Sequence, residues 1–160
     1  MRPLRSISGP WALASLAMVA IIWGNSLVPG AASGETSHAV LEMVHAFLQG
    51  LGLPYGWVTN FLVRKAAHFT EYAVLGVLVS QAIDGSRRCD RVALLAAAGV
   101  LVLVPSLDET IQLFVSGRAG QLTDVLLDCC GAAFGVAIRC LACKFAARRA
   151  AAWANQEDGA

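Results

Sequence analysis

Four stretches of the sequence approach the length of about 20 apolar residues that a helix needs to cross a bilayer. They are residues 11–29, 66–83, 92–114 and 122–143. A bilayer contains no water to bond free backbone groups, so each stretch must be a helix or part of a closed barrel. Their apolar residues form continuous runs and do not alternate with polar ones, which favours helices. The sequence therefore predicts an all-α, polytopic integral membrane protein with about four transmembrane helices.

Composition supports the membrane interpretation. Hydrophobic residues make up 57% of the chain and charged residues 14%. Soluble domains carry about 25% charged residues, so this chain has too few polar side chains to cover the surface of a soluble domain.

The first stretch also fits a signal peptide, because Arg2 and Arg5 precede it and small residues follow at 31–34. Its apolar run is long for the hydrophobic region of a signal peptide, so an uncleaved span is preferred. Cleavage would leave the orientation of the other spans unchanged.

Lysine and arginine are unequally divided between the two ends of the predicted spans. One side carries Arg2, Arg5, Arg87, Arg88, Arg91, Arg139, Lys144, Arg148 and Arg149, and the other carries Arg64, Lys65 and Arg118. Basic residues concentrate in cytoplasmic loops, so we predict a multi-pass protein of the cell membrane with both termini in the cytoplasm. Residues 1–149 then form the transmembrane domain, and residues 150–160 a disordered cytoplasmic tail.

The first outer loop, residues 30–63, carries a candidate amphipathic helix at His38–Gln49. Its apolar residues follow helical spacing, which predicts a helix lying on the outer membrane interface. A plain connector and a lid over a site beneath it both remain open.

Ionisable side chains of the last three spans all fall in the outer halves of those spans. Together with the adjacent polar groups they are Arg64, Lys65, His68, Glu71, Tyr72, Asp108, Glu109, Gln112, Arg118, Asp124 and Asp128. The spacing i, i+4, i+7 of Arg64, His68 and Glu71 places these three on one helix face. A charge exposed to lipid costs several kcal/mol, so the sequence predicts one polar pocket shared by these helices and open to the outside.

Three basic residues and five carboxylates near this pocket give a formal sum of −2 when His68 is neutral. A protonated carboxylate, a charged His68, a bound cation or a cationic ligand would offset this charge.

Two sequence motifs carry less information. Gly131 and Gly135 form a GxxxG pattern, for which packing inside the protein is favoured over dimerisation. Cys140 and Cys143 form a CxxC, but no second CxxC or nearby histidine accompanies it. The five cysteines are therefore interpreted as small apolar filler without a zinc-binding role.

The segments RKAAHFTEYAVLG and DETIQLFVSGRAGQLTDVLLDCCGAAFG together resemble the VanZ-like membrane protein family. The family pattern is an RKxxHxxEY helix, a DExxQ segment, a loop arginine, and then an aspartate before a glycine-rich helix. The segment IIWGNSLVPG adds the serine at the end of the first helix, here Ser26. The resemblance covers about residues 11–135, and it implies that the polar positions collected above, from Arg64 to Asp124, are the functional ones. Asp128 is a departure, because the family usually has Asn there.

Three functions remain open. The first is a protein that binds or modifies a cell-envelope lipid or lipophilic compound and so affects susceptibility to glycopeptide-type antibiotics. The second is a membrane-embedded hydrolase or transferase acting on a lipid-linked substrate, and the third is an ion-pair network with a structural role only. The family's namesake is associated with teicoplanin resistance, but the resemblance implies no established reaction.

For an enzyme, the candidate catalytic residues are His68, Glu71, Asp108, Glu109 and Asp124, with His68 as general acid or base. Arg64 and Arg118 would clamp a phosphate or carboxylate. Neither a GxSxG nor an HExxH motif is present to supply a recognised mechanism.

The expected partner is a membrane lipid or a lipid-linked envelope precursor, and no nucleic-acid partner is expected. No cofactor is predicted, but a divalent metal stays open. Its candidate ligands are His68, Glu71, Asp108 and Asp124, which are hard or borderline donors.

Overall fold

The structure is a computed structural model that describes residues 7–85 and 89–157, with side chains up to residue 152. The elements in the described chain are α1 (Gly9–Ser26), α2 (Gly30–Gly50), α3 (Asn60–Ile83), α4 (Arg91–Gln112) and α5 (Leu122–Glu157). No strand occurs in these residues, so the predicted all-α class is confirmed.

Local sequence signals set where several helices begin. Thr59 caps α3, its hydroxyl accepting a hydrogen bond from the Leu62 backbone N–H, and Asp90 caps α4 by accepting from Ala93. Such caps satisfy backbone N–H groups that the first helical turn leaves without a partner. α3 thus begins six residues before the predicted span at 66–83, and this extension brings Arg64 into the helix.

Not every predicted span is long and apolar enough to cross a membrane by itself. Within the described residues, α4 and the part of α5 from Leu122 to Ala152 meet that condition. α1 and α2 meet it only as a pair, with a bend of 108° between them. His68, Glu71 and Gln81 interrupt the apolar run of α3. Helices long and apolar enough to cross a membrane are therefore present, whereas the four-span topology stays a prediction.

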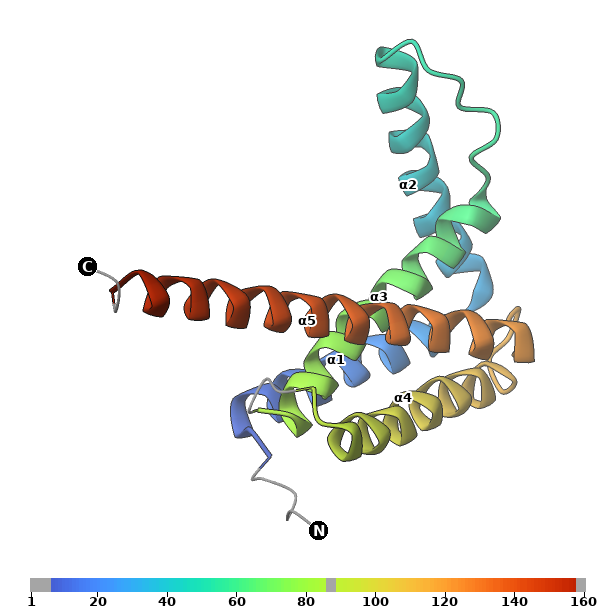
Figure 1. The fold of residues 1–160 in the computed structure, drawn as a ribbon. Coiled ribbons are helices and arrows are strands. Elements are labelled where there is room, and N and C mark those ends of the chain that lie inside the picture. Colours follow the sequence, from blue (N-terminus) through green and yellow to red (C-terminus); the bar gives the residue numbers. More distant parts are fainter. Residues whose placement is uncertain (1–6, 86–88, 158–160) are drawn as a thin grey trace.

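α3 and α5 pack together through glycines (Figure 1). A Cβ atom at Gly135 would lie 1.9 Å from the Ala73 carbonyl oxygen, and one at Gly131 would lie 2.5 Å from that of Phe69. The two helix backbones approach so closely that no larger residue fits at these positions. The GxxxG pattern therefore serves packing within the chain, as the sequence predicts.

The apolar core lies where α1, α3, α4 and α5 pack together. It is centred on Ile22 of α1, Leu75 and Val79 of α3, and Leu101 of α4. At the other end of α3, the Arg139 guanidinium bonds to the Asp84 carboxylate at 3.0 Å and to the Gln81 side chain at 2.8 Å. Arg139, predicted as a basic residue of the cytoplasmic side, is therefore a buried ion-pair partner.

α2 projects away from the other helices and packs against α3 (Figure 1). It contains the predicted helix at His38–Gln49 but begins earlier, at Gly30, whose N–H donates to the Ser116 carbonyl at 3.0 Å. The location of α2 on a membrane interface stays a prediction.

α5 corrects the prediction for the C-terminal tail. The helix continues to Glu157, so residues 150–157 are helical where the sequence predicts disorder. The alanine-rich run AAWA has high intrinsic helix propensity, which allows the preceding helix to continue through it. Residues 158–160 lie outside the described residues.

Candidate functional site

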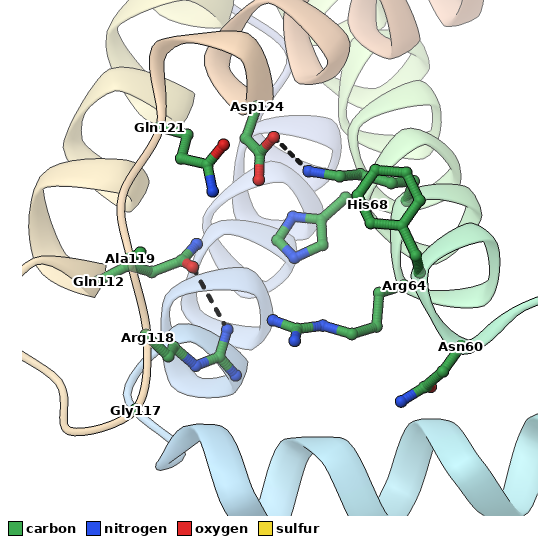
Figure 2. A pocket seen from close by; sticks show the side chains of 11 residues that line it. Asn60, Arg64, His68, Gln112, Gly117, Arg118, Ala119, Gln121 and Asp124 are labelled. Atoms are coloured by element: carbon green, nitrogen blue, oxygen red, sulfur yellow. Dashed lines mark hydrogen bonds and ion pairs between the residues drawn. The ribbon is translucent and has the colours of Figure 1, made fainter.

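Polar side chains meet where α1 and α4 end and where α3 and α5 begin (Figure 2). They surround a pocket of about 370 Å³. Its lining consists of Asn60, Phe61, Arg64, Lys65, His68, Gln112, Gly117, Arg118, Ala119, Gln121 and Asp124. Six residues that the sequence predicts as ligand-binding line this pocket: Arg64, Lys65, His68, Gln112, Arg118 and Asp124.

Arg118 is held in place by the end of the first helix. Its Nε donates to the Val28 carbonyl at 2.8 Å and its Nη2 to the Asn25 carbonyl at 2.8 Å. These carbonyls belong to the last turn of α1 and its extension, where a helix leaves its acceptors without partners. Burial and the neighbouring Arg64 lower the pKa of Arg118, but an arginine still carries its charge at neutral pH.

Arg64 points toward Arg118 across the pocket, as Figure 2 shows. Its guanidinium makes no hydrogen bond or ion pair with any residue in the described part of the chain. The neighbouring Lys65, in contrast, forms an ion pair with Asp124. Two guanidinium groups that face each other repel, and an anion between them would remove that repulsion.

Gln112 connects the pocket to carboxylates buried behind it. The Gln112 side-chain amide donates to Asp108 Oδ2 at 3.3 Å and to Glu109 Oε1 at 3.1 Å, and its oxygen accepts from Arg118 at 3.5 Å. The other Glu109 oxygen accepts from the Gln121 backbone N–H at 2.8 Å. Asp108 and Glu109 are therefore wall residues behind the pocket and not part of its lining.

A second group of ionisable residues lies deeper. His68, Asp108 and Asp128 each offer one ligating atom, and these three atoms lie within 4.8 Å of one another. His68 Nδ1 is 3.8 Å from Asp128 Oδ1, and both aspartates are fully buried. The three residues come from three different helices, which is why no local motif identifies the group.

Glu71 and Tyr72 do not line the polar pocket, but Glu71 lines a larger neighbouring cavity together with Arg64, His68 and Arg118. Glu71 accepts a hydrogen bond from the Asn25 side chain at 3.0 Å, on the side of α3 that faces α1. Tyr72 is fully buried in the apolar core. Asn25 is a polar contact that sequence reasoning did not select, although its position beside Ser26 at the end of an apolar run is a usable signal.

A larger cavity of about 1050 Å³ lies between α2 and α3. Apolar side chains dominate it, among them Val40, Val44 and Phe47 of α2 and Leu62 of α3. Arg64, His68 and Arg118 line both this cavity and the polar pocket. The sequence did not predict the apolar cavity, because it depends on the 108° bend between α1 and α2.

Comparison with known proteins gives one match. The family model described as VanZ/LLP1 matches residues 11–143, which include every site residue named above. No curated protein and no solved structure matches the chain.

Proposed function

Because the chain belongs to the VanZ/LLP1 family, we propose that it binds a cell-envelope lipid and thereby affects susceptibility to glycopeptide-type antibiotics. The lipid headgroup, an anion such as a phosphate, lies between Arg64 and Arg118. The lipid tail lies in the apolar cavity between α2 and α3.

The observation that carries this proposal is Arg64, a guanidinium without a partner among the described residues, at the junction of the two cavities. Arginine binds phosphate through two parallel N–H donors, and such charge-assisted bonds are about twice as strong as neutral ones. A lipid supplies both the anion for the polar pocket and the apolar chain for the cavity. A small water-soluble anion would leave the cavity lining without an occupant of matching chemistry.

Placement in the membrane is part of the same proposal. The pocket opens to the outside, both termini lie in the cytoplasm, and α2 lies along the outer interface. The uneven distribution of lysine and arginine supports this orientation. A lipid headgroup bound in this pocket would not be accessible to antibiotics that act on the cell envelope.

A second candidate is a membrane-embedded hydrolase or transferase. His68 supports it, because its ring lines the polar pocket and lies 3.8 Å from the Asp128 carboxylate. A histidine beside a carboxylate is suited to general acid–base work on a bound phosphate or acyl group. A changed lipid species in cells that express the protein would favour this candidate over binding alone.

Native mass spectrometry of the full chain, titrated in detergent with phosphatidylglycerol, tests the binding proposal. The wild type should bind one lipid, and Arg64→Gln should bind at least about tenfold more weakly, which corresponds to about 1.4 kcal/mol. Arg148→Gln is the matched control, because Arg148 is exposed on the C-terminal part of α5, far along the chain from the pocket.

Equal lipid binding by Arg64→Gln and the wild type would overturn the proposal. Loss of folded protein in Arg64→Gln would instead favour the purely structural role for the polar network.

A further inference from the structure

We propose that His68, Asp108 and Asp128 form a binding site for a divalent transition-metal ion, with Zn²⁺ and Mn²⁺ as the fitting ions. The site lies behind the polar pocket, and its occupation does not require a bound lipid.

The spacing of the ligand atoms suits a metal ion. Three atoms within 4.8 Å of one another lie at most about 2.8 Å from a common centre. Zinc binds histidine nitrogen and aspartate oxygen at about 2.0–2.2 Å, so each side chain needs to move by less than about 1 Å. Rotation about side-chain bonds can produce a shift of this size without moving the helices.

Unsatisfied acceptors in the group point to a ligand. Both carboxylate oxygens of Asp128 are buried and accept no hydrogen bond from the described residues. Asp108 Oδ1 and His68 Nδ1 are buried without a hydrogen bond as well, although the hydroxyls of Ser26 and Tyr72 lie near Asp108. Asp108 Oδ2 accepts from Gln112 at 3.3 Å, whereas Asp128 has no donor among the described residues. A buried carboxylate without any donor is costly, and a cation would pair with Asp128 and with the remaining Asp108 oxygen at once.

The neighbouring cations make no bond to these carboxylates, and Arg64 makes no hydrogen bond or ion pair in the described chain. Lys65 forms its ion pair with Asp124, and Arg118 donates to Asn25, Val28 and Gln112. The two buried carboxylates therefore have no guanidinium or ammonium bonded to them in the described chain. A divalent ion would balance both negative charges.

Ligand chemistry selects the kind of metal. One imidazole nitrogen with two carboxylate oxygens suits Zn²⁺ and Mn²⁺, whereas Mg²⁺ and Ca²⁺ prefer oxygen alone. Three protein ligands leave a coordination position open, as in sites where a metal also holds water or a ligand. His68 lines the pocket, so the open position lies on the pocket side.

The metal site differs from the set that the sequence suggested. His68 and Asp108 belong to both, but Glu71 is bonded to Asn25 and Asp124 is paired with Lys65. Asp128 takes their place, because it lies one helical turn beyond Asp124 and faces inward.

The test measures metal content directly. The full chain in detergent is stripped with a chelator, incubated with one equivalent of Zn²⁺ or Mn²⁺, desalted, and analysed by plasma mass spectrometry. The wild type should retain about one ion per chain, and Asp128→Asn should bind at least about tenfold more weakly. Glu42→Gln is the matched control, an exposed carboxylate of α2 outside the group, and it should retain the ion.

A second readout keeps the test decisive if Asp128→Asn does not fold. His68→Gln should remove the nitrogen coupling that pulsed electron paramagnetic resonance detects at bound Mn²⁺, which a general loss of structure would not do selectively. A wild type that retains no ion, or Asp128→Asn that retains as much ion as the wild type, would overturn the proposal. Arg64→Gln should keep the metal while losing lipid, so failure of lipid binding and failure of metal binding are separate outcomes.

Discussion

Arg118 shows how one residue holds several parts of the site together. Its three donor nitrogens reach two carbonyls at the end of α1 and the side chain of Gln112 at the end of α4. Gln112 in turn reaches the buried carboxylates of Asp108 and Glu109. Arg118, from the loop between α4 and α5, thus connects the ends of α1 and α4. The same side chain faces Arg64, which has no partner among the described residues.

Residue chemistry outside the site gives a pH-dependent prediction at Cys89, in the connection between α3 and α4. Burial and the neighbouring Cys140 raise the pKa of Cys89 from 9.0 to about 11. A raised pKa leaves less of the reactive thiolate at neutral pH, about a hundredfold less for this shift. We expect the rate of alkylation by iodoacetamide, followed by mass spectrometry of the peptide, to rise about tenfold per pH unit from pH 8 to pH 10.

Cys140→Ala is the matched variant for this measurement. Removal of the neighbouring thiol should lower the pKa of Cys89 and increase its alkylation rate at pH 8. A wild-type rate at pH 8 equal to that of cysteine in an unfolded peptide would contradict the prediction.

Among the helix pairs, α3 and α5 pack through several glycines and leave little room for larger residues. Gly76 of α3 lies against Ala132 of α5, while Gly131 and Gly135 of α5 lie against Phe69 and Ala73 of α3. Both helices carry site residues, His68 on one and Asp128 on the other. Gly131 lies three residues after Asp128, and Phe69 follows His68 directly, so this glycine packing sets how far apart the two side chains stand.

Gly135→Ala should destabilise the protein by more than about 2 kcal/mol, because its Cβ would lie 1.9 Å from the Ala73 carbonyl oxygen and force the helices apart. Gly99→Ala in α4 is the control, since no atom lies within 4 Å of the position of its Cβ. That change should be neutral or stabilising by up to about 1 kcal/mol. Thermal unfolding in detergent, followed by size-exclusion chromatography, measures both, and equal midpoints for the two variants would contradict the packing account.

The helices themselves were predictable from apolar runs, because a membrane leaves the backbone few alternatives. α4 at Arg91–Gln112 nearly coincides with the predicted 92–114. The bend before α2 was not predictable, because a Leu-Val-Pro-Gly segment stops a helix without stating the angle at which the next one leaves. The sequence predicts a disordered tail from residue 150 because chain termini are usually poorly ordered. The helix propensity of the alanine-rich run instead allows α5 to continue to Glu157.

The candidate site could be predicted from the sequence only in part. A rise of 1.5 Å per residue converts position along a helix into depth, so the sequence predicts that Arg64 and His68 lie near the loop residue Arg118, and all three line the polar pocket. Rotation about the helix axis is harder to predict, and the sequence does not predict that Glu71 bonds to Asn25. Contacts that depend on rotation need the neighbouring helices in place.

On the scale of the whole molecule, the polar side chains of the site and the exposed apolar side chains lie in different places. The residues of the candidate site gather at one end of the bundle and the Arg139–Asp84 ion pair lies at the other, while large apolar side chains such as Leu95 and Leu103 of α4 and Leu126 of α5 are exposed on its flanks. Apolar flanks of this kind are expected of helices that face lipid.

The orientation of the molecule is tested by fusions to its C-terminus. A cytoplasmic C-terminus predicts a fluorescent green fluorescent protein fusion and an inactive alkaline phosphatase fusion, since the phosphatase requires oxidation of its disulfides outside the cytoplasm. Active phosphatase with a dark fluorescent fusion would place the C-terminus, and with it the predicted topology, on the other side. Fusions in the outer loop after Gly50 should give the opposite pair of results.

The three residues shared by the two cavities, Arg64, His68 and Arg118, have a further consequence. On the proposed mode of lipid binding, a free anion in the polar pocket and a lipid headgroup from the apolar cavity would compete for the same guanidinium groups. Inorganic phosphate would then act as a competitive antagonist of the lipid, raising the lipid concentration needed for half-saturation and leaving the plateau unchanged.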